Sequence, residues 1–310
     1  MKTVISIDHG NRQIKTSTGH AFTSGYVESG HLLTMDSDVL QFNKKEYALS
    51  DKCIIQKNDK SVDDDYFILT LFAIGKELMA QPRQAANTPY EVELLTGLPP
   101  LHYKSLRKKF KTYFTERDDI IKIRLNNRHM AITIKNAYVY PQAYAAALTV
   151  YDEIKEYPSV NIIDIGGYTA DCLYLEKMQM NMNICTSLYK GVNTLFQKIN
   201  EQARATGGQD IRESILENIL RNDKKTIDNY SKSRVDLVQN QARKFAAEIL
   251  SEASHTGQDL VEDMTVFVGG GAMLLRTYLE ECNIAKRMIF VNDLFANAKG
   301  YEIIHCMKKK

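Results

Sequence analysis

Hydrophobic and polar residues follow one another along this chain in short blocks that predict strands and helices in turn. The β-branched run TVISID, residues 3–8, predicts a strand that turns at residues 9–11 and resumes as a second strand. Short polar segments follow to about residue 62 and predict a small, strand-rich excursion. Over 61–81 apolar residues recur at helical spacing, with acids in the first turn and Pro82 behind the end, which predicts a helix.

The alternation continues through the rest of the chain. Residues 91–100 predict a strand that ends at two prolines, and residues 104–114 predict an amphipathic helix with a solvated basic face. Residues 120–141 predict a pair of strands, and Pro141 is expected to start a helix of small residues. Residues 209–256 are mostly helical in pattern. Because strands and helices alternate, with local hairpins between them, the fold class indicated is α/β.

Composition narrows the classes of protein to consider. The chain has 310 residues, 44% of them hydrophobic and 25% charged, which is ordinary for globular proteins and long enough for two domains. A formal net charge of +2 is too close to neutral to indicate nucleic acid or an anionic membrane as a direct partner. The sequence has no apolar run long enough to span a membrane. The five cysteines are scattered without a Cys-x-x-Cys, which fits reduced thiols in a cytoplasm better than disulfides or zinc.

A glycine turn between acids marks the stretch NIIDIGGYTADCLYL, residues 161–175. Its centre repeats the start of the chain, because IDHG at 7–10 aligns with IDIG at 163–166 at an offset of 156, about half of the chain. The same offset places Lys15 on Asp171. Two such hairpins predict two similar lobes that face each other across a cleft.

The residue types in these hairpins suit phosphate and magnesium. Asp8 and Asp164 stand at strand ends, where carboxylates can orient the water shell that Mg²⁺ retains. Glycines after each acid leave backbone N–H groups open to phosphate oxygens, and Lys15 can neutralise one phosphate charge. Either hairpin alone could equally be a surface β-turn, because Asp-x-Gly is common in turns.

A third glycine turn lies in VFVGGGAMLL, residues 266–275. Gly269, Gly270 and Gly271 separate an apolar strand from a helix, so a ribose and base could lie against bare backbone and the helix start could favour an α-phosphate. Taken alone, these glycines could serve only as a tight joint between strand and helix. Neither the dinucleotide-binding nor the Walker glycine pattern occurs.

The order of these pieces resembles the motif set of the actin, sugar-kinase and heat-shock ATPase superfamily. IDHGNRQIK, YPQAYAAA, DIGGYTAD, VFVGGGAMLL and FANAKGYEII correspond in turn to its first phosphate loop, first connecting helix, second phosphate loop, adenosine loop and second connecting helix. Within the superfamily, the chain is most similar to bacterial plasmid-segregation actin-like proteins of the ParM or StbA type. The resemblance implies two similar actin-like (RNase H-like) lobes that flank a nucleotide cleft.

The resemblance also implies domain limits. The first lobe is expected at residues 1–150, with a strand-rich insertion at about 25–95. A C-terminal helix at 293–310 is expected to complete this lobe, and the second lobe is expected at 151–292.

The first phosphate loop of the family implies roles for five residues. Asp8 corresponds to the acid that faces Mg²⁺ through water, and Gly10, Asn11 and Lys15 correspond to nucleotide-binding positions. Arg12 stands where the family carries small residues, so it either adds a phosphate contact or points away.

The second phosphate loop and the first connecting helix imply the catalytic pair. Asp164 corresponds to the acid beside the metal, and Gly166, Gly167 and Thr169 to residues that line the β- and γ-phosphates. Gln142 corresponds to the residue that positions the attacking water, unless it serves only to cap its helix or faces solvent.

The adenosine loop and the second connecting helix complete the set. Gly269, Gly270 and Gly271 correspond to the adenosine-binding glycines. Small residues of the last helix would permit close helix packing at the hinge, a structural role; they are Asn297, Ala298 and Gly300.

The resemblance implies a cytoplasmic ATPase that polymerises into filaments with Mg²⁺ and ATP and hydrolyses the ATP, in plasmid or DNA segregation. Its implied partners are further copies of itself and a DNA-binding adaptor protein, with no direct nucleic acid and no membrane. Two alternatives stay open on the residues alone. One is a small-molecule kinase of the same fold, in which Asp171 could be the base, and the other is a nucleotide-binding scaffold that does not hydrolyse.

Overall fold

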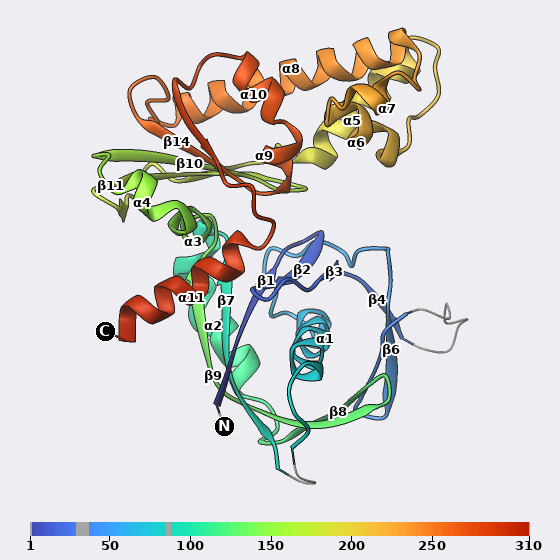
Figure 1. Ribbon diagram of the computed structural model, residues 1–310, viewed down its shortest axis with the longest axis vertical. Coiled ribbons are helices and arrows are strands. Elements are labelled where there is room, and N and C mark those ends of the chain that lie inside the picture. The colour runs from blue at the N-terminus through green and yellow to red at the C-terminus, as the bar shows by residue number, and fades with distance from the viewer. Residues whose placement is uncertain (1, 29–36, 85–87, 310) are drawn as a thin grey trace. The chain divides into compact units, whose positions relative to one another are not determined.

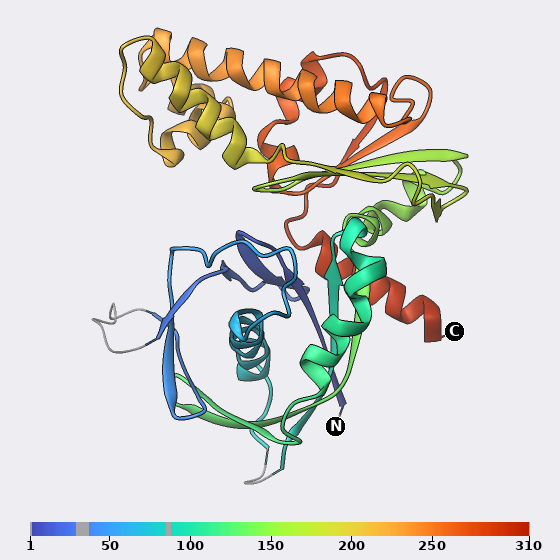
Figure 2. The ribbon, with the colours of Figure 1, turned by 180° about the vertical axis from the view of Figure 1, so that it is seen from behind.

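The computed structural model describes residues 2–28, 37–84 and 88–309. The chain divides into two compact units, and Figures 1 and 2 show their ribbons from opposite sides. Unit 1 comprises Met1–Thr149 and Phe295–Lys310, and unit 2 comprises Val150–Leu294. The chain leaves unit 1 once and returns to it once, so unit 2 is an insertion within unit 1.

Unit 1 is built on a mixed nine-stranded sheet with the order β3-β2-β1-β7-β9-β8-β5-β6-β4. β1, β7 and β9 are parallel neighbours, and the remaining pairs are antiparallel. β7 reads YEVELLTGL and is buried along almost its whole length, as expected of a central strand between parallel neighbours. The strands are β1 (Lys2–His9), β2 (Gln13–Thr16), β3 (Ala21–Thr23), β4 (Tyr26–Glu28), β5 (Val39–Phe42), β6 (Lys45–Leu49), β7 (Tyr90–Leu98), β8 (Ile121–Leu125) and β9 (Arg128–Pro141).

Helix α1 (Asp65–Met79) forms the centre of unit 1. Every residue from Tyr66 to Gly75 is buried, and the sheet curls around the helix in Figure 1. A helix that is apolar on all sides must be enclosed in this way, because it has no face to offer to water. The helix predicted at 61–81 is therefore confirmed, with shorter limits.

The other helices of unit 1 lie against its central strands. α2 (Pro100–Thr115) packs on β9 and β7, whereas α11 (Ala296–Lys309) packs on β7, β1 and the short helix α3 (Tyr144–Ala147). A Cβ atom at Gly300 would collide with the Ala145 carbonyl oxygen, so the close approach of α11 and α3 requires glycine there. The expectation that small residues of the last helix permit close packing is confirmed at this position.

The first connecting helix differs from its prediction. Pro141 does not start a helix, because it is the last residue of β9 and pairs with Leu98 of β7. The helical segment begins only at Tyr144 and is broken into three short pieces: α3, the 3₁₀ turn η1 (Leu148–Val150) and α4 (Tyr151–Ile154).

Unit 2 has a six-stranded sheet covered by helices. The strand order is β12-β11-β10-β14-β15, with β13 paired to β11. One apolar core joins β10, β11 and β14 to the helices α5, α6, α8 and α10, which are drawn on one side of the sheet in Figure 1. The strands are β10 (Ser159–Ile165), β11 (Ala170–Glu176), β12 (Gln179–Met180), β13 (Thr186–Leu188), β14 (Met264–Val268) and β15 (Arg287–Phe290). The helices besides α4 are α5 (Val192–Ala205), α6 (Glu213–Leu220), α7 (Lys224–Ile227), α8 (Lys232–His255), α9 (Gly270–Leu274) and α10 (Arg276–Glu281).

Candidate functional site

The hairpin β1–β2, called the first hairpin below, places the predicted acid and lysine side by side. Asp8 is directly opposite Lys15 in the antiparallel register, so both side chains lie on the same face of the sheet. Asp8 is only 4% exposed, and the Gln142 Nε2 donates a hydrogen bond to its Oδ1 at 2.8 Å. Among the residues that the structure describes, Gln142 is the one donor to this carboxylate, and Lys15 makes no ion pair.

Hydrogen bonds to backbone carbonyl oxygens hold the turn of the first hairpin in place. Lys60, which is 4% exposed, donates to the carbonyl oxygen of His9. Ser24 donates through Oγ to the Gly10 oxygen at 2.5 Å and through its backbone N–H to the Arg12 oxygen at 3.0 Å. Because C=O and N–H of a planar peptide point in opposite directions, the N–H groups of Gly10 and the next residue point away from these donors. Successive N–H groups turned to one side can form an anion-binding nest.

A buried polar network supports this turn from below. His9 is fully buried, and its Nδ1 and Nε2 each lie 2.7 Å from a threonine hydroxyl, of Thr96 and Thr70 respectively. Thr70 donates to the Tyr66 carbonyl oxygen at 2.6 Å, so its oxygen accepts from Nε2–H while Thr96 donates to Nδ1. Burial, together with the nearby charge of Lys60, lowers the pKa of His9 from 6.5 to about 3. The imidazole is therefore neutral at physiological pH.

The structure also shows where the side chains of the next two residues of the first loop lie. Asn11 Oδ1 accepts a hydrogen bond of 3.0 Å from the Tyr66 hydroxyl, so it ties the turn to α1. The Arg12 side chain is exposed. Lys60 was not singled out in the sequence, because segment 50–62 has no periodic pattern and its lysines look alike. Ser24 and the His9 network were missed because their hydrogen bonds join segments far apart in the sequence.

The hairpin β10–β11, the second hairpin, repeats the first in register. Asp164 is directly opposite Asp171, as Asp8 is opposite Lys15, which agrees with the offset of 156 found in the sequence. Asp171 therefore lies on the same face as Asp164, and it accepts a hydrogen bond from the Ser187 hydroxyl.

The glycine turn of the second hairpin is partly occupied by its own hydrogen bonds. The Gly166 N–H already donates to the Thr169 carbonyl oxygen at 2.8 Å, so this N–H is not open to a phosphate as expected. The Gly166 and Gly167 carbonyl oxygens accept from the first turn of α5, from Val192 at 3.0 Å and from Asn193 at 2.8 Å. A Cβ atom at Gly166 would meet only the Thr169 oxygen, at 3.5 Å. Nothing in unit 2 excludes a side chain at Gly166, whose absence leaves open space at the turn.

The third glycine turn packs onto the end of β10. Gly269 has φ +89°, and a side chain there would collide with the Asp164 carboxylate and lie 2.7 Å from the Ile165 oxygen. Gly271 is equally crowded by Ile165, whereas a Cβ atom at Gly270 would touch only Leu294, at 3.8 Å. Unit 2 therefore brings Asp164 and the predicted adenosine loop together, and two of these three glycines are required by the fold itself.

Gln142 lies between β9 and α3 and is 8% exposed. Its backbone N–H donates to the Leu98 oxygen at 2.9 Å, and its side chain reaches Asp8. A carboxylate accepts only, so the amide nitrogen of Gln142 faces Asp8 and its Oε1 is left to accept from another group.

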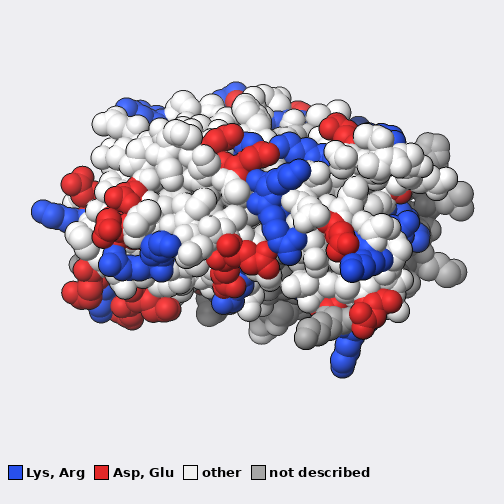
Figure 3. Space-filling model, turned by 90° about the horizontal axis from the view of Figure 1, so that it is seen from above, with Lys and Arg blue, Asp and Glu red and all other residues white. Residues whose placement is uncertain are grey.

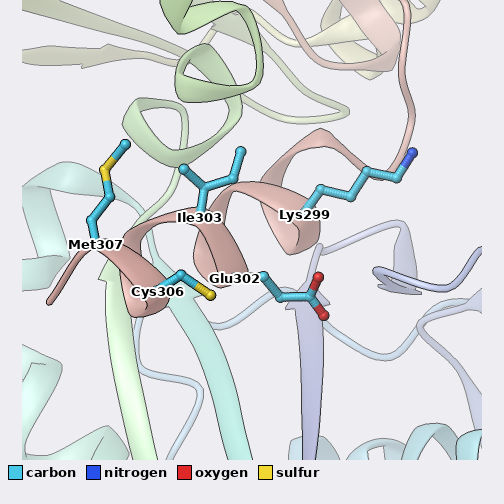
Figure 4. Close-up of a pocket in the computed structure, with 5 residues that line it drawn as sticks. All are labelled: Lys299, Glu302, Ile303, Cys306 and Met307. Carbon is cyan, nitrogen blue, oxygen red and sulfur yellow. The ribbon is translucent and has the colours of Figure 1, made fainter. Parts of the chain in front are cut away.

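The rest of the described structure adds no further candidate site residues. A hollow of about 430 Å³ is bordered by α11 residues, and Figure 4 shows them on successive turns of the helix. None of them is a predicted site residue; they are Lys299, Glu302, Ile303, Cys306 and Met307. In the described part of the chain no three His, Cys, Asp or Glu side chains gather as a metal cluster. None of the described helices is both long and apolar enough to cross a membrane.

Charges are mixed on the face shown in Figure 3, where Lys and Arg lie among Asp and Glu. In unit 2, Lys190 and Lys198 each pair with Glu248 at 2.7 Å, and Arg243 pairs with Glu281 at 2.8 Å.

The two halves of the chain match two family models. Residues 6–144 match "Actin like proteins N terminal domain", and residues 162–281 match "Archaeal actin homologue MreB-like, C-terminal". The chain belongs to the actin-like protein superfamily. The resemblance to this superfamily found in the sequence is confirmed. The curated protein sequences give no match.

Solved structures of actin-like proteins share the fold over the whole chain. Ta0583, an archaeal actin homologue, has a TM-score of 0.78 at 16% identity, with 99% of each chain covered. Apo ParM of psk41 has a TM-score of 0.74 at 14% identity, covering 99% of this chain and 98% of that one. ParM in a 15-stranded filament from Clostridium botulinum has a TM-score of 0.73 at 18% identity, with 99% of each chain covered. The predicted α/β actin-like fold is therefore confirmed.

Proposed function

We propose that this actin-like chain is an ATPase that assembles into filaments when it binds Mg²⁺ and ATP and that disassembles after hydrolysis. We further propose that the filaments segregate plasmid or other DNA through an adaptor protein that binds the DNA. Relatives of the same fold support the nucleotide and the filament. Ta0583 has been crystallised in complex with ADP, ParM from Clostridium botulinum forms a filament, and so does Alp12.

The observation that carries the proposal is the environment of Asp8. Its carboxylate is almost fully buried, yet among the described residues it has one hydrogen-bond donor and no cation. A buried charge with so few partners is costly unless a cation or further donors reach it. The water shell of Mg²⁺ supplies such donors, so the surroundings of Asp8 in unit 1 fit a metal held through water. By the family correspondence we propose the same role for Asp164 in unit 2. Bound Mg²⁺ would neutralise charge on the phosphates of ATP.

The residues of the two hairpins would then divide the work of binding. The N–H groups at Gly10 and Asn11, turned away from Lys60 and Ser24, would donate to phosphate oxygens, and Lys15 would add a positive charge. In the second hairpin the open space at Gly166 would let a phosphate approach the turn closely. The open position at Gly270 fits the family's adenosine loop in the same way.

Gln142 would orient the attacking water. Because its Nε2 is engaged by Asp8, its Oε1 is the atom that can accept a hydrogen bond from water. A neutral amide cannot take the proton, so Gln142 positions the water and does not deprotonate it. We therefore expect slow turnover, as in other nucleotide hydrolases that use a glutamine.

The test combines sedimentation with phosphate release. The purified chain should pellet when Mg²⁺ and ATP are added, and phosphate should appear as the pellet later dissolves. Gln142→Ala should still pellet while its phosphate release falls about 100-fold, because water positioning is lost and phosphate binding is kept. Parallel reactions with GTP show which nucleotide is used.

Three outcomes would contradict the proposal. If the chain does not pellet with Mg²⁺ and ATP, the proposed filament formation is wrong. If Gln142→Ala hydrolyses ATP as fast as the parent chain, the proposed role of Gln142 is wrong. Transfer of phosphate to a sugar or an acid without pelleting would indicate the small-molecule kinase instead. The role in segregation is tested separately, by whether deletion of the chain raises the loss rate of the replicon that encodes it.

A further inference from the structure

The backbone at Ala143 adopts a strained conformation. Its φ and ψ are 60° and −54°, and the Tyr144 N–H donates back to the Gln142 oxygen at 2.6 Å across it. These values define the γ-turn with positive φ, which is rare and strained for a residue with a side chain. Ala143 is fully buried. Strain of this kind persists only where the surroundings hold it, and it gathers at functional sites.

One side chain holds this turn in place. Asn297, at the start of α11, accepts a hydrogen bond from the Ala143 N–H through its Oδ1 at 2.9 Å. On the other side of the turn, the Gln142 N–H is fixed to the Leu98 oxygen of β7 at 2.9 Å. Without Asn297, the N–H of a buried, strained residue would lose this partner, and the turn could relax toward an ordinary backbone.

The turn sets the direction of Gln142. Because Ala143 follows it directly, a relaxed turn would rotate the backbone from which the Gln142 side chain reaches Asp8. We infer that Asn297 is a positioning residue for Gln142: its side-chain oxygen maintains the γ-turn at Ala143 and thereby keeps the Gln142 amide against Asp8. This inference rests on the proposed ATPase function for its catalytic part. It assigns Asn297 more than the packing role expected of a small residue in the last helix.

If Asn297 only held α11 in place, its substitution would have a different effect. Other contacts already hold this helix, among them the Ser6 hydroxyl on the Ala298 oxygen at 2.6 Å and the close approach at Gly300. Loss of fastening alone would lower stability without a specific effect on turnover. The two roles are therefore separable by experiment.

The experiment compares three variants of the full chain. Asn297→Ala removes the acceptor, and Asn297→Asp keeps an oxygen at the same place. The matched control is Asn200→Ala in unit 2, because the Asn200 Oδ1 also accepts a backbone N–H, that of Ile211, at 2.8 Å. Phosphate release at saturating ATP, the KM for ATP and thermal stability are measured for each.

We expect Asn297→Ala to lower kcat by about 10- to 100-fold with KM changed less than about twofold, because misplacement acts on the reacting water and not on phosphate binding. Asn297→Asp should restore most of the turnover, and Asn200→Ala should leave it unchanged. The effect should also vanish in the Gln142→Ala background, because a residue that acts only through Gln142 has nothing left to position.

Amide hydrogen exchange at Ala143 gives a readout that does not depend on catalysis. Asn297→Ala should raise the exchange rate of this buried N–H, whereas Asn200→Ala should not. Turnover of Asn297→Ala within about twofold of the parent, or an equal loss in the Gln142→Ala background, would overturn the inference alone. If the parent chain hydrolyses no ATP, the proposed function fails together with the catalytic part of the inference. Unchanged exchange at Ala143 would then refute the structural part as well.

Discussion

The first and second hairpins pair their strands in the same register but carry different charges at corresponding positions. Asp8 faces Lys15 across β1 and β2, whereas Asp164 faces Asp171 across β10 and β11. Opposite charges placed directly across a strand pair attract, and like charges repel. In the proposed function, the first hairpin would therefore receive an anion beside its acid. The second hairpin would use its negative charge to attract a cation, besides accepting the hydrogen bond from Ser187.

The two hairpins also differ in the surroundings of a buried residue at corresponding positions. His9 of the first hairpin corresponds to Ile165 of the second, and both are fully buried. His9 lies in the polar network of Thr70, Thr96 and Lys60, while Ile165 belongs to the apolar core of unit 2. The same hairpin backbone therefore accommodates either a polar or an apolar buried residue at this position, provided that each buried polar group makes a hydrogen bond.

The largest effect should come from acid, because only the first hairpin carries a buried histidine. The pKa of His9 is lowered from 6.5 to about 3, so between these values the unfolded chain binds a proton that the folded chain does not. The contribution of His9 to stability is therefore full above pH 6.5 and falls as the pH drops toward 3, by about 1.4 kcal/mol per pH unit. Urea unfolding at several pH values, with hydrogen exchange to separate the units, measures this slope.

His9→Leu should make the acid slope of unit 1 shallower by the His9 contribution, with the slope from His305, whose pKa burial also lowers, remaining. The control His129→Leu, at an exposed position of β9, should leave the slope unchanged. An equal slope in His9→Leu and in the parent chain would show that other groups carry the acid sensitivity.

The next largest effect should follow from giving the first hairpin the charge pattern of the second. Lys15→Asp places a carboxylate opposite Asp8, so it removes one attraction for phosphate and adds one repulsion. We expect the affinity for ATP to fall by at least about 100-fold, since a charge-assisted contact alone is worth about 1.5–3 kcal/mol. Fluorescent nucleotide binding measures the change. Lys122→Asp, at an exposed position of β8, is the control, and a loss of similar size there would point to net charge as the cause.

Glycine substitutions should separate folding from binding in the two turns. A Cβ atom at Gly10 would lie 2.6 Å from the Gln13 carbonyl oxygen, whereas one at Gly166 would have 3.5 Å to its nearest neighbour. Gly10→Ala should therefore destabilise unit 1 by about 2 kcal/mol through overpacking. Gly166→Ala should keep the melting temperature and weaken nucleotide binding. Thermal unfolding and nucleotide titration of both variants check this, and the reverse order would refute it.

The smallest effect concerns the paired acids. Asp171→Asn keeps an acceptor for the Ser187 hydroxyl but removes one of two like charges from the second hairpin. Without metal, we expect a gain in stability of less than about 1 kcal/mol, and with Mg²⁺ a smaller rise in melting temperature than in the parent chain. Asp236→Asn, exposed on α8, is the control. An unchanged response to Mg²⁺ would mean that Asp171 takes no part in holding the cation.

Much of the fold could be predicted because its signals are local. Helix α1 could be predicted from apolar residues at helical spacing. The repeated Asp-x-Gly correctly aligned the two hairpins, with Asp8 corresponding to Asp164. The bounds of the first connecting helix were wrong because alanine has no local preference that reveals a γ-turn at Ala143.

The contacts that shape the candidate site could not be predicted, because they join segments far apart in sequence. Lys60 reaches the His9 oxygen only once the excursion has folded over the first hairpin. The bond from Asn297 to Ala143 spans about half the chain and depends on how α11 returns. Gly191 looks like any helix-preceding glycine, yet a side chain there would collide with the backbone at Gly167. Tertiary packing alone gives these residues their importance.

The insertion of unit 2 within unit 1 has a consequence for synthesis on the ribosome. Unit 2 has its own apolar core and is complete before α11 is made, so it can fold first. Unit 1 must wait for α11, which carries Tyr301 against Gly97 and Asn297 against Ala143. A nascent or truncated chain would therefore carry an unfinished first unit, in which the turn that orients Gln142 is still unsupported. The order of translation thus withholds the candidate catalytic arrangement until the last helix has been added.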